Sequence, residues 1–377
     1  MTRLAFLFLI VDTLPYEDLW TAWLGHLPDA HVHIHAKHPE RIRSEWVRQR
    51  LITSSSGDIV TYRPDWGSIE LVRAMLALLR AALRDPDVGR LCFLSESCLP
   101  AVDPAAAERT LLGATRSWLD IKFRPNNGYS ALHQFAPMRC GWRPAKADQW
   151  CLLLRAHAER LLRQPRCWQA FKRVKAADEI FIPTLLRMYG ILHDEGTLVC
   201  HHGEDECRSR FPHTARLSWT ADGPDRTVMR VKPRTDPAEL STDDIMNAAI
   251  LALDTDWPVY GEVESRKLTY VDWSYSCLHP TTFRWNLALH RRAQERGCLF
   301  VRKVIDVDHD AWRQWLAAPT QYIPATPLLF RDNDKDRRNR SKLQHYTDCT
   351  TPYNERLWPE ADCWDYVTQR TTNKCAA

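Results

Sequence analysis

The chain has 377 residues, 45% of them hydrophobic, so it is long enough to bury one large core or two modest ones. Its 51 basic and 47 acidic side chains are mixed along the sequence and give a formal charge of +4, which argues against a dedicated nucleic-acid-binding protein. The 12 cysteines are scattered from Cys92 to Cys375 without a Cys-x-x-Cys pair, which excludes a zinc ribbon and a small disulfide scaffold.

The first apolar run, Leu4–Val11, follows Arg3 and could be mistaken for a signal or an anchor. It is only about eight residues long and lacks a small-residue cleavage site, so a buried parallel strand is the better interpretation. No other window approaches the roughly 20 apolar residues of a membrane span. We therefore predict a cytoplasmic protein without a targeting segment.

Helical and extended patterns alternate through the first hundred residues. The predicted elements are a helix over Tyr16–Leu24, a strand at His31–His35, a helix around Leu71–Leu83 and a strand at Leu91–Leu94. Such alternation predicts an α/β fold with a parallel sheet covered by helices on both faces. Ligands of these sheets bind at the carboxyl ends of the strands, so the residues that follow each strand are the candidate site residues.

Two adjacent carboxylates, Asp178 and Glu179, stand immediately before the apolar run Ile180–Ile182. A helix that begins there stabilises an anionic Glu179 through its first-turn dipole. A positioned carboxylate is what a general base requires. An ordinary helix N-terminus has the same pattern and is the more common reason for it.

Seven short segments together resemble the core-2/I-branching glycosyltransferase family (glycosyltransferase family 14), which also contains peptide O-xylosyltransferases and plant members. They occur in the family's order over residues 3–305. The segments are Asp65–Val72 (DWGSIELV), Leu94–Pro100 (LSESCLP), Trp142–Trp150 (WRPAKADQW), Asp178–Thr184 (DEIFIPT), Leu268–Ser274 (LTYVDWS), His279–Phe283 (HPTTF) and Leu299–Lys303 (LFVRK).

The resemblance implies a GT-A type nucleotide-diphospho-sugar transferase fold, with a mixed, mostly parallel sheet flanked by helices. Residues 1–330 are expected to form the catalytic domain, with an insertion at about 190–262 as a possible acceptor side. Residues 331–377 are expected to form a C-terminal extension that packs on the body. Its aromatic residues indicate packing, and its mixed-charge opening, Arg331–Arg340, is by default solvated surface.

The implied activity is inverting, metal-independent transfer of GlcNAc or xylose from a UDP-sugar to an acceptor hydroxyl, which forms a β-glycosidic bond. The acceptor would be a glycan, a glycoside or another hydroxylated molecule, and no cofactor is expected. Two alternatives stay open: a catalytically silent carbohydrate-binding protein on the same fold, and a nucleic-acid-binding protein that uses the charged tail, which would lose affinity steeply with salt.

The resemblance also assigns roles to individual residues. Glu179 would be the base, with Asp178 as a helix cap or orienting partner, and Arg302 and Lys303 would grip the leaving diphosphate. The other donor-binding candidates are Val11, Asp65, Trp66, Gln149, Trp150 and His279, and the weaker acceptor-side candidates are Ser95 and Glu96. Without the resemblance, an Arg-Lys pair is usually surface charge and a tryptophan usually packs in a core.

Two features depart from the family pattern. Xylosyltransferase-type relatives have an Asp after the second strand, where this chain has His35-Ala36-Lys37, so recognition of uridine is an inference. The animal branching enzymes have a further Arg upstream of Lys303. No match stands near Thr281, which leaves Arg302 or Arg284 for that contact.

Three other acidic or cysteine-containing segments are weaker candidates for a metal site. Asp254–Asp256 and Asp306–Asp308 have the Asp-x-Asp pattern but do not follow an early strand, so loops or helix caps are the better interpretation. The Cys200–Cys207 segment fits no standard zinc spacing and is predicted to be an exposed polar loop. Ser241–Leu253 is predicted to be a capped helix.

Overall fold

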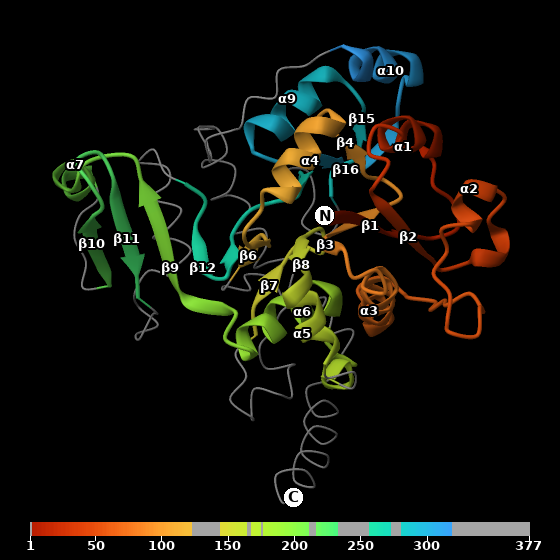
Figure 1. Cartoon of the computed structure of the whole chain (residues 1–377), viewed down its shortest axis with the longest axis horizontal. Helices are drawn as coiled ribbons and strands as arrows, with labels where there is room; N and C mark the ends of the chain where they lie inside the picture. The colour runs from red at the N-terminus through yellow and green to blue at the C-terminus, as the bar shows by residue number, and fades with distance from the viewer. Residues whose placement is uncertain are drawn as a thin grey trace, which may run out of the picture.

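The computed structural model has three layers, with a ten-stranded sheet between two groups of helices (Figure 1). The strand order in this sheet is β10-β11-β9-β12-β13-β5-β8-β3-β1-β2. The structure describes residues 2–122, 144–163, 167–174, 176–210, 216–232, 256–272 and 280–318.

The N-terminal strands form the parallel part of this sheet. Strand β1 (Arg3–Ile10) lies between β2 (His31–Ala36) and β3 (Val88–Ser95), and all three run in the same direction. Leu9 of β1 is level with His35 on one side and Ser95 on the other, so the three carboxyl ends lie at one edge. The strands and helices predicted in this part of the sequence are all present, each within a few residues of the expected bounds.

Beyond β3 the pairing becomes mostly antiparallel. Strand β8 (Leu152–Leu154) runs antiparallel to both β3 and β5 (Ser117–Trp118), and β13 (Val263–Glu264) is parallel to β5. The sheet then continues antiparallel through β12 (Val259–Gly261), β9 (Leu192–Cys200), β11 (Thr227–Val231) and β10 (Leu217–Ala221). The observed fold class is therefore α/β with a large mixed sheet flanked by helices, as predicted.

Alternate residues of β1 pack into two separate hydrophobic cores, one on each face of the sheet. Phe6 and Phe8 pack with the helices drawn above the sheet in Figure 1, while Ala5 and Leu7 pack with those below it. The upper helices are α1 (Glu17–Leu24), α4 (Pro104–Leu112), α9 (Leu287–Glu295) and α10 (His309–Ala317). The lower ones are α3 (Ile69–Ala82), α5 (Arg155–Leu162) and α6 (Ala177–Met188).

Short strands carry the last described segment back to the N-terminal half. Strand β16 (Phe300–Arg302) lies parallel to β14 (Thr269–Val271) and antiparallel to β4 (Leu99–Pro100), which follows β3. The remaining elements are η1 (Pro39–Arg41), α2 (Glu45–Arg48), β6 (Ile121–Lys122), β7 (Lys146–Ala147), η5 (Cys167–Phe171), α7 (Glu204–Arg210), β15 (Phe283–Arg284) and β17 (Val304–Asp306). This return places Arg302 beside the end of β3.

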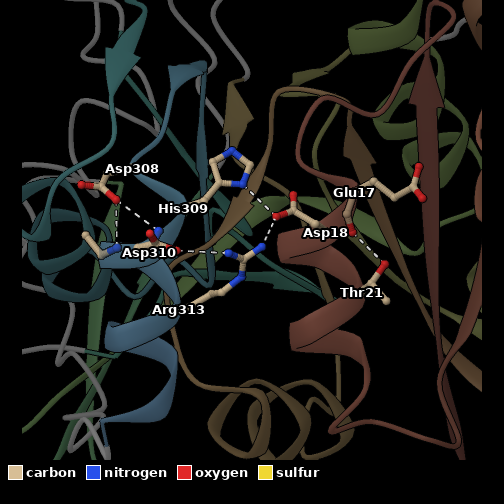
Figure 2. Close-up of polar contacts among 8 residues, drawn as sticks. Glu17, Asp18, Thr21, Asp308, His309, Asp310 and Arg313 are labelled. Carbon is tan, nitrogen blue, oxygen red and sulfur yellow. Dashed lines mark hydrogen bonds and ion pairs between the residues drawn. The ribbon is translucent and has the colours of Figure 1, made fainter.

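Helix α10 is attached to α1 through one shared carboxylate (Figure 2). Asp18 on α1 accepts hydrogen bonds from His309 Nδ1 at 2.8 Å and from Arg313 Nη2 at 2.5 Å. Asp308 caps α10 by accepting from the backbone N–H groups of Asp310 and Ala311. The contact ties residues almost 300 positions apart in the sequence.

Some predictions concern residues that the structure does not describe. The predicted helix at Ser241–Leu253 and the C-terminal extension at 331–377 both lie outside the described residues. Among the helices that are described, none combines the length and the apolar character needed to cross a bilayer.

Candidate active site

A cavity of about 400 Å³ opens at the carboxyl ends of β1, β2 and β3. Ten of the twelve predicted site residues line it: Val11, Asp65, Trp66, Ser95, Glu96, Gln149, Trp150, Asp178, Glu179 and Arg302. Of the other two, Lys303 is exposed beyond Arg302, and His279 lies outside the described residues. These ten residues come from six separate stretches of sequence and converge on one cavity.

Helix α6 begins at this cavity in an unusual backbone conformation. Its N-cap is Ala176, with a left-handed φ of 52°, and no side chain caps the helix. The N–H of Ala177 donates instead to the carbonyl of Gly67, in the segment that carries Trp66. Asp178 therefore lies in the first turn and is not the helix cap that was one of its two expected roles. The correction follows from the left-handed Ala176, which turns the chain into the helix two residues earlier.

Glu179 lies in the same first turn and forms an ion pair with Lys146 of β7. The distance from Lys146 Nζ to Glu179 Oε2 is 2.8 Å, and the two side chains are only 13% and 20% exposed. The helix dipole and the ammonium group both favour the anionic carboxylate. The ion pair therefore holds Glu179 in place on the cavity wall.

Asp178, its neighbour, is in a different electrostatic environment. Burial and, secondarily, the charge of Glu179 raise the pKa of Asp178 from 3.8 to about 7, against the opposing effect of Lys146 and Arg302. Its Oδ1 is buried and has no hydrogen-bond partner among the described residues. Asp178 therefore exchanges its proton near neutral pH.

Arg302 reaches the cavity from β16 and is fixed by two contacts. Its Nε donates to Ser95 Oγ at 3.2 Å, and its guanidinium carbon lies 4.5 Å from the centre of the Trp150 ring. The stacked guanidinium keeps further N–H donors available to a ligand.

Glu96 lies beside these groups and is held by the backbone of β1. It accepts the N–H of Val11 at 3.1 Å. Burial raises the pKa of Glu96, and the Val11 hydrogen bond and the charges of Arg302 and Lys303 oppose that rise. Ser95 and Glu96 therefore contact the Arg302 side of the cavity, while their acceptor-side role stays a prediction.

The end of β2 contributes cavity residues that the candidate set omitted, namely His35, Lys37, His38 and Arg41. His35 is buried, and its Nε2 accepts the N–H of Tyr62 at 2.9 Å, so Nδ1 carries the proton. Burial lowers the pKa of His35 to about 4, which keeps it neutral at physiological pH. The rule that ligands bind at the carboxyl ends of parallel strands was the signal that could have included these residues.

The weaker metal candidates have other partners. His201 pairs with Asp256 at 2.9 Å, and Asp306 pairs with Arg284 at 3.4 Å. In the described ranges, no three His, Cys, Asp or Glu side chains gather as metal ligands would.

The predicted exposed loop at Cys200–Cys207 is wrong for its two ends. Cys200 closes β9, Cys207 lies in α7, and both side chains are buried. The residues between the two cysteines are polar, so the segment as a whole has the composition of an exposed loop. The end of the strand and the helix each bury one cysteine, which composition alone does not reveal.

A mixed sheet flanked by helices, with its cavity at the carboxyl ends of the parallel strands, is the architecture of a GT-A-like glycosyltransferase. The family model described as Core-2/I-Branching enzyme matches residues 4–209, more than half of the sequence. The chain therefore belongs to the core-2/I-branching enzyme family, and the predicted resemblance is confirmed.

Among curated proteins, the chain is similar to "Glycosyltransferase BC10" of Oryza sativa subsp. japonica. The two are 25% identical over 225 residues, which cover 50% of this chain and 54% of the relative. The chain thus spans about half the length of the curated relative that it matches. Together, the family and this relative support glycosyltransferase activity in general.

Proposed function

We propose that this protein transfers a sugar from a UDP-sugar to an acceptor hydroxyl with inversion, and that the reaction needs no metal. The donor sugar is GlcNAc or xylose, and the acceptor is a glycan, a glycoside or another hydroxylated molecule. One observation carries the proposal: Glu179 and Arg302, the base and the leaving-group cation of the hypothesis, line the same cavity.

Glu179 is the proposed base. It takes the proton of the acceptor hydroxyl while that oxygen attacks the anomeric carbon and the bond to the diphosphate oxygen breaks. Its ion pair with Lys146 and its place in the first turn of α6 fix its position on the cavity wall. A single displacement inverts the anomeric centre, so an α-linked donor gives a β-glycoside.

Arg302 is the proposed partner of the departing UDP. The electron pair of the broken bond leaves with the diphosphate, whose charge grows as the bond breaks. A guanidinium already fixed by Ser95 and Trp150 meets that charge without rearrangement. Lys303, exposed next in sequence, adds a second positive charge beside Arg302.

The donor itself would lie between the strand ends and the two cavity tryptophans. Trp150 is buried beneath Arg302, whereas Trp66 is 61% exposed at the opening. The basic end of β2, with Lys37 only 3.6 Å from Asp65, replaces the acidic residue found in xylosyltransferase-type relatives. The nucleotide base is therefore the part of the donor for which this chain departs most from its family.

Calorimetric titration of the purified protein tests this proposal. UDP, UDP-GlcNAc and UDP-xylose are each added with EDTA and again with manganese. We expect micromolar UDP binding that is unaffected by EDTA, and the sugar nucleotide that binds more tightly identifies the donor.

Each other outcome has a definite meaning. Binding that requires manganese contradicts the metal-independent mechanism. Binding of sugar nucleotide without any turnover, with a panel of hydroxylated acceptors, favours the catalytically silent carbohydrate-binding protein. No binding of any of the three rejects UDP-sugars as the donor class.

A further inference from the structure

A second cavity, of about 640 Å³, lies on the antiparallel part of the main sheet. It shares no lining residue with the candidate active site. Helix α6 separates the two. Glu179 is at its start, and Gly190, just past its end, accepts a hydrogen bond from His193 of the second cavity at 3.0 Å. The helix rises roughly 14 Å from Glu179 to its last residue, Met188, at 1.5 Å per residue.

The floor of this second cavity is a row of side chains that crosses four strands. Thr197 of β9 is level with Arg230 of β11 on one side and with Val259 of β12 on the other. Val259 is level in turn with Glu264 of β13. Neighbouring strands are about 4.8 Å apart, so the row is roughly 14 Å long.

An arginine stands at each end of the row. Arg230 is exposed on β11, and Arg116 lies near Glu264, where its charge opposes the rise in the pKa of Glu264 that burial causes. Within the described residues, neither the Arg116 nor the Arg230 side chain forms a hydrogen bond or ion pair. Arg226, at the cavity edge, differs because it pairs with Asp222 at 3.3 Å. Two guanidinium groups are therefore available to a ligand.

The wall beside the row is aromatic and polar. Trp257 is partly exposed in the cavity lining, and an indole offers apolar surface to the face of a sugar ring. Glu195 is exposed and provides a carboxylate that accepts hydrogen bonds from hydroxyl groups, whereas Glu264 is paired with Arg266 at 3.6 Å. Carboxylates distributed among the arginines repel a polyanion as dense in charge as a nucleic acid.

We propose that this groove, formed by Arg116, Thr197, Arg230, Trp257, Val259 and Glu264, binds an extended acidic oligosaccharide outside the donor site. Sugar carboxylates pair with Arg116 and Arg230, as planar guanidinium groups favour, while a sugar ring lies against Trp257. An extended peptide fits less well, because β9 is paired on both sides and offers no free strand edge. The groove and the donor cavity can be tested separately.

The test is calorimetry on the full chain with four probes of similar length: tetragalacturonate, neutral cellotetraose, a tetraglutamate peptide and a short single-stranded oligonucleotide. We expect tetragalacturonate to bind at least about tenfold more tightly than the others, since charge-assisted hydrogen bonds are the strong ones. Equal binding of cellotetraose, tighter binding of the peptide or oligonucleotide, or no binding of tetragalacturonate would overturn the proposal.

Variants locate the site. Arg230→Gln and Trp257→Ala should each weaken tetragalacturonate binding by about ten- to a hundredfold. Arg208→Ala is the matched control, because this exposed arginine pairs with Glu204 on α7, away from the groove. Unchanged affinity in Arg230→Gln contradicts the proposed site.

UDP titration of the same samples separates this proposal from the proposed function. Each variant should bind UDP as the parent chain does, which also shows that it is folded. If the parent chain binds tetragalacturonate but not UDP, the groove stands and the donor assignment fails; the reverse result has the opposite meaning.

Discussion

The two ends of the main sheet build recognition sites in different ways. In the parallel end, β2-β1-β3, each connection returns the chain through a helix, so the three carboxyl ends meet at one edge and enclose the candidate active site. In the antiparallel end, β11-β9-β12, the ends of successive strands point in opposite directions. Its groove lies instead on the face of the sheet, made of every second residue of each strand.

This difference in construction produces a difference in chemistry. The edge cavity buries its carboxylates, so that Asp178 and Glu96 have raised pKa values and the local charge depends on the neighbours. The face groove leaves the Arg230 side chain exposed to solvent. A buried edge therefore suits chemistry on protons, and an open face suits binding of an extended ligand.

The largest expected effect belongs to the edge cavity alone. Glu179→Gln should lower turnover by about 10²–10⁴-fold, the usual effect of removing a positioned base, and leave donor affinity unchanged. The measurement is product formation at saturating donor, with calorimetry for donor binding. Glu159→Gln is the matched control, because Glu159 is also an ion-paired helical carboxylate, with Arg155 as its partner. Near-normal turnover in Glu179→Gln would remove this residue from the role.

The next largest effect concerns Asp178 and has a pH dependence with a definite sign. Its pKa is raised in the folded state, so the unfolded chain releases this proton more readily, and the folded state loses stability as the pH rises from about 4 to about 7. Asp178→Asn cannot ionise. We therefore expect it to be more stable than the parent chain at pH 8, by at most about 4 kcal/mol, and to lose this advantage at pH 4.

Urea unfolding at the two pH values measures that difference. An equal difference between Asp178→Asn and the parent chain at pH 4 and pH 8 would show that Asp178 does not titrate in this range. No comparable change is expected for Arg230→Gln in the face groove, since the side chain is exposed.

A smaller effect, on UDP affinity, distinguishes the role of Arg302 from that of its neighbour Lys303. Arg302→Ala should weaken UDP binding by about ten- to a hundredfold, because it removes a charge-assisted contact. Lys303→Ala should weaken it less, since Lys303 is exposed and outside the cavity lining.

Arg284→Ala tests the alternative that Arg284 binds the diphosphate. The Arg284 side chain is 84% exposed and paired with Asp306. A larger loss there than in Arg302→Ala would assign the diphosphate to Arg284.

The sequence predicted the parallel end better than the antiparallel end for a physical reason. A buried parallel strand such as Leu4–Val11 is a continuous apolar run, and the sheet topology places the residues at its carboxyl end in the cavity. Strand β9 (LHDEGTLVC) mixes charges and a glycine with its apolar residues, so nothing in its composition distinguished it from a polar loop. Its strand character comes from tertiary pairing on both sides.

The same distinction applies within the candidate site. Glu179 and Arg302 were predicted because each stands in a short motif, whereas Lys146 was not, although it lies only 2.8 Å from Glu179. An ion pair between β7 and α6 depends on how the two elements pack. At the end of β2, the sequence showed only that the family's acidic residue is missing. Lys37 and Arg41 line one cavity only after the chain folds, so the sequence did not predict them as site residues.

The smallest predicted effect concerns the antiparallel end alone. Gly261 of β12 has a φ of +68°, and a Cβ there would lie 2.6 Å from the carbonyl of Ile191. Gly261→Ala should cost roughly 1–2 kcal/mol for the left-handed conformation, plus the effect of this contact. We expect weaker tetragalacturonate binding with unchanged UDP affinity.

Gly223→Ala is the control for the backbone conformation, since Gly223 also has a positive φ but open space around its Cβ position. Gly261→Ala should be the less stable of the two in thermal unfolding. Loss of UDP binding together with groove binding would show that the two ends of the sheet do not keep their structure independently.

The contact between Arg302 and Ser95 has a consequence for biosynthesis. The two residues are 207 positions apart, and Asp18 and Arg313 are 295 apart, whereas β1, β2 and β3 all lie within the first 95 residues. A nascent chain can form the parallel strands early, but the ribosome must release more than 300 residues before the guanidinium can reach the cavity. Contacts so distant in sequence close slowly. The proposed diphosphate contact is therefore completed last, and UDP binding that appears during synthesis would report that the chain has closed.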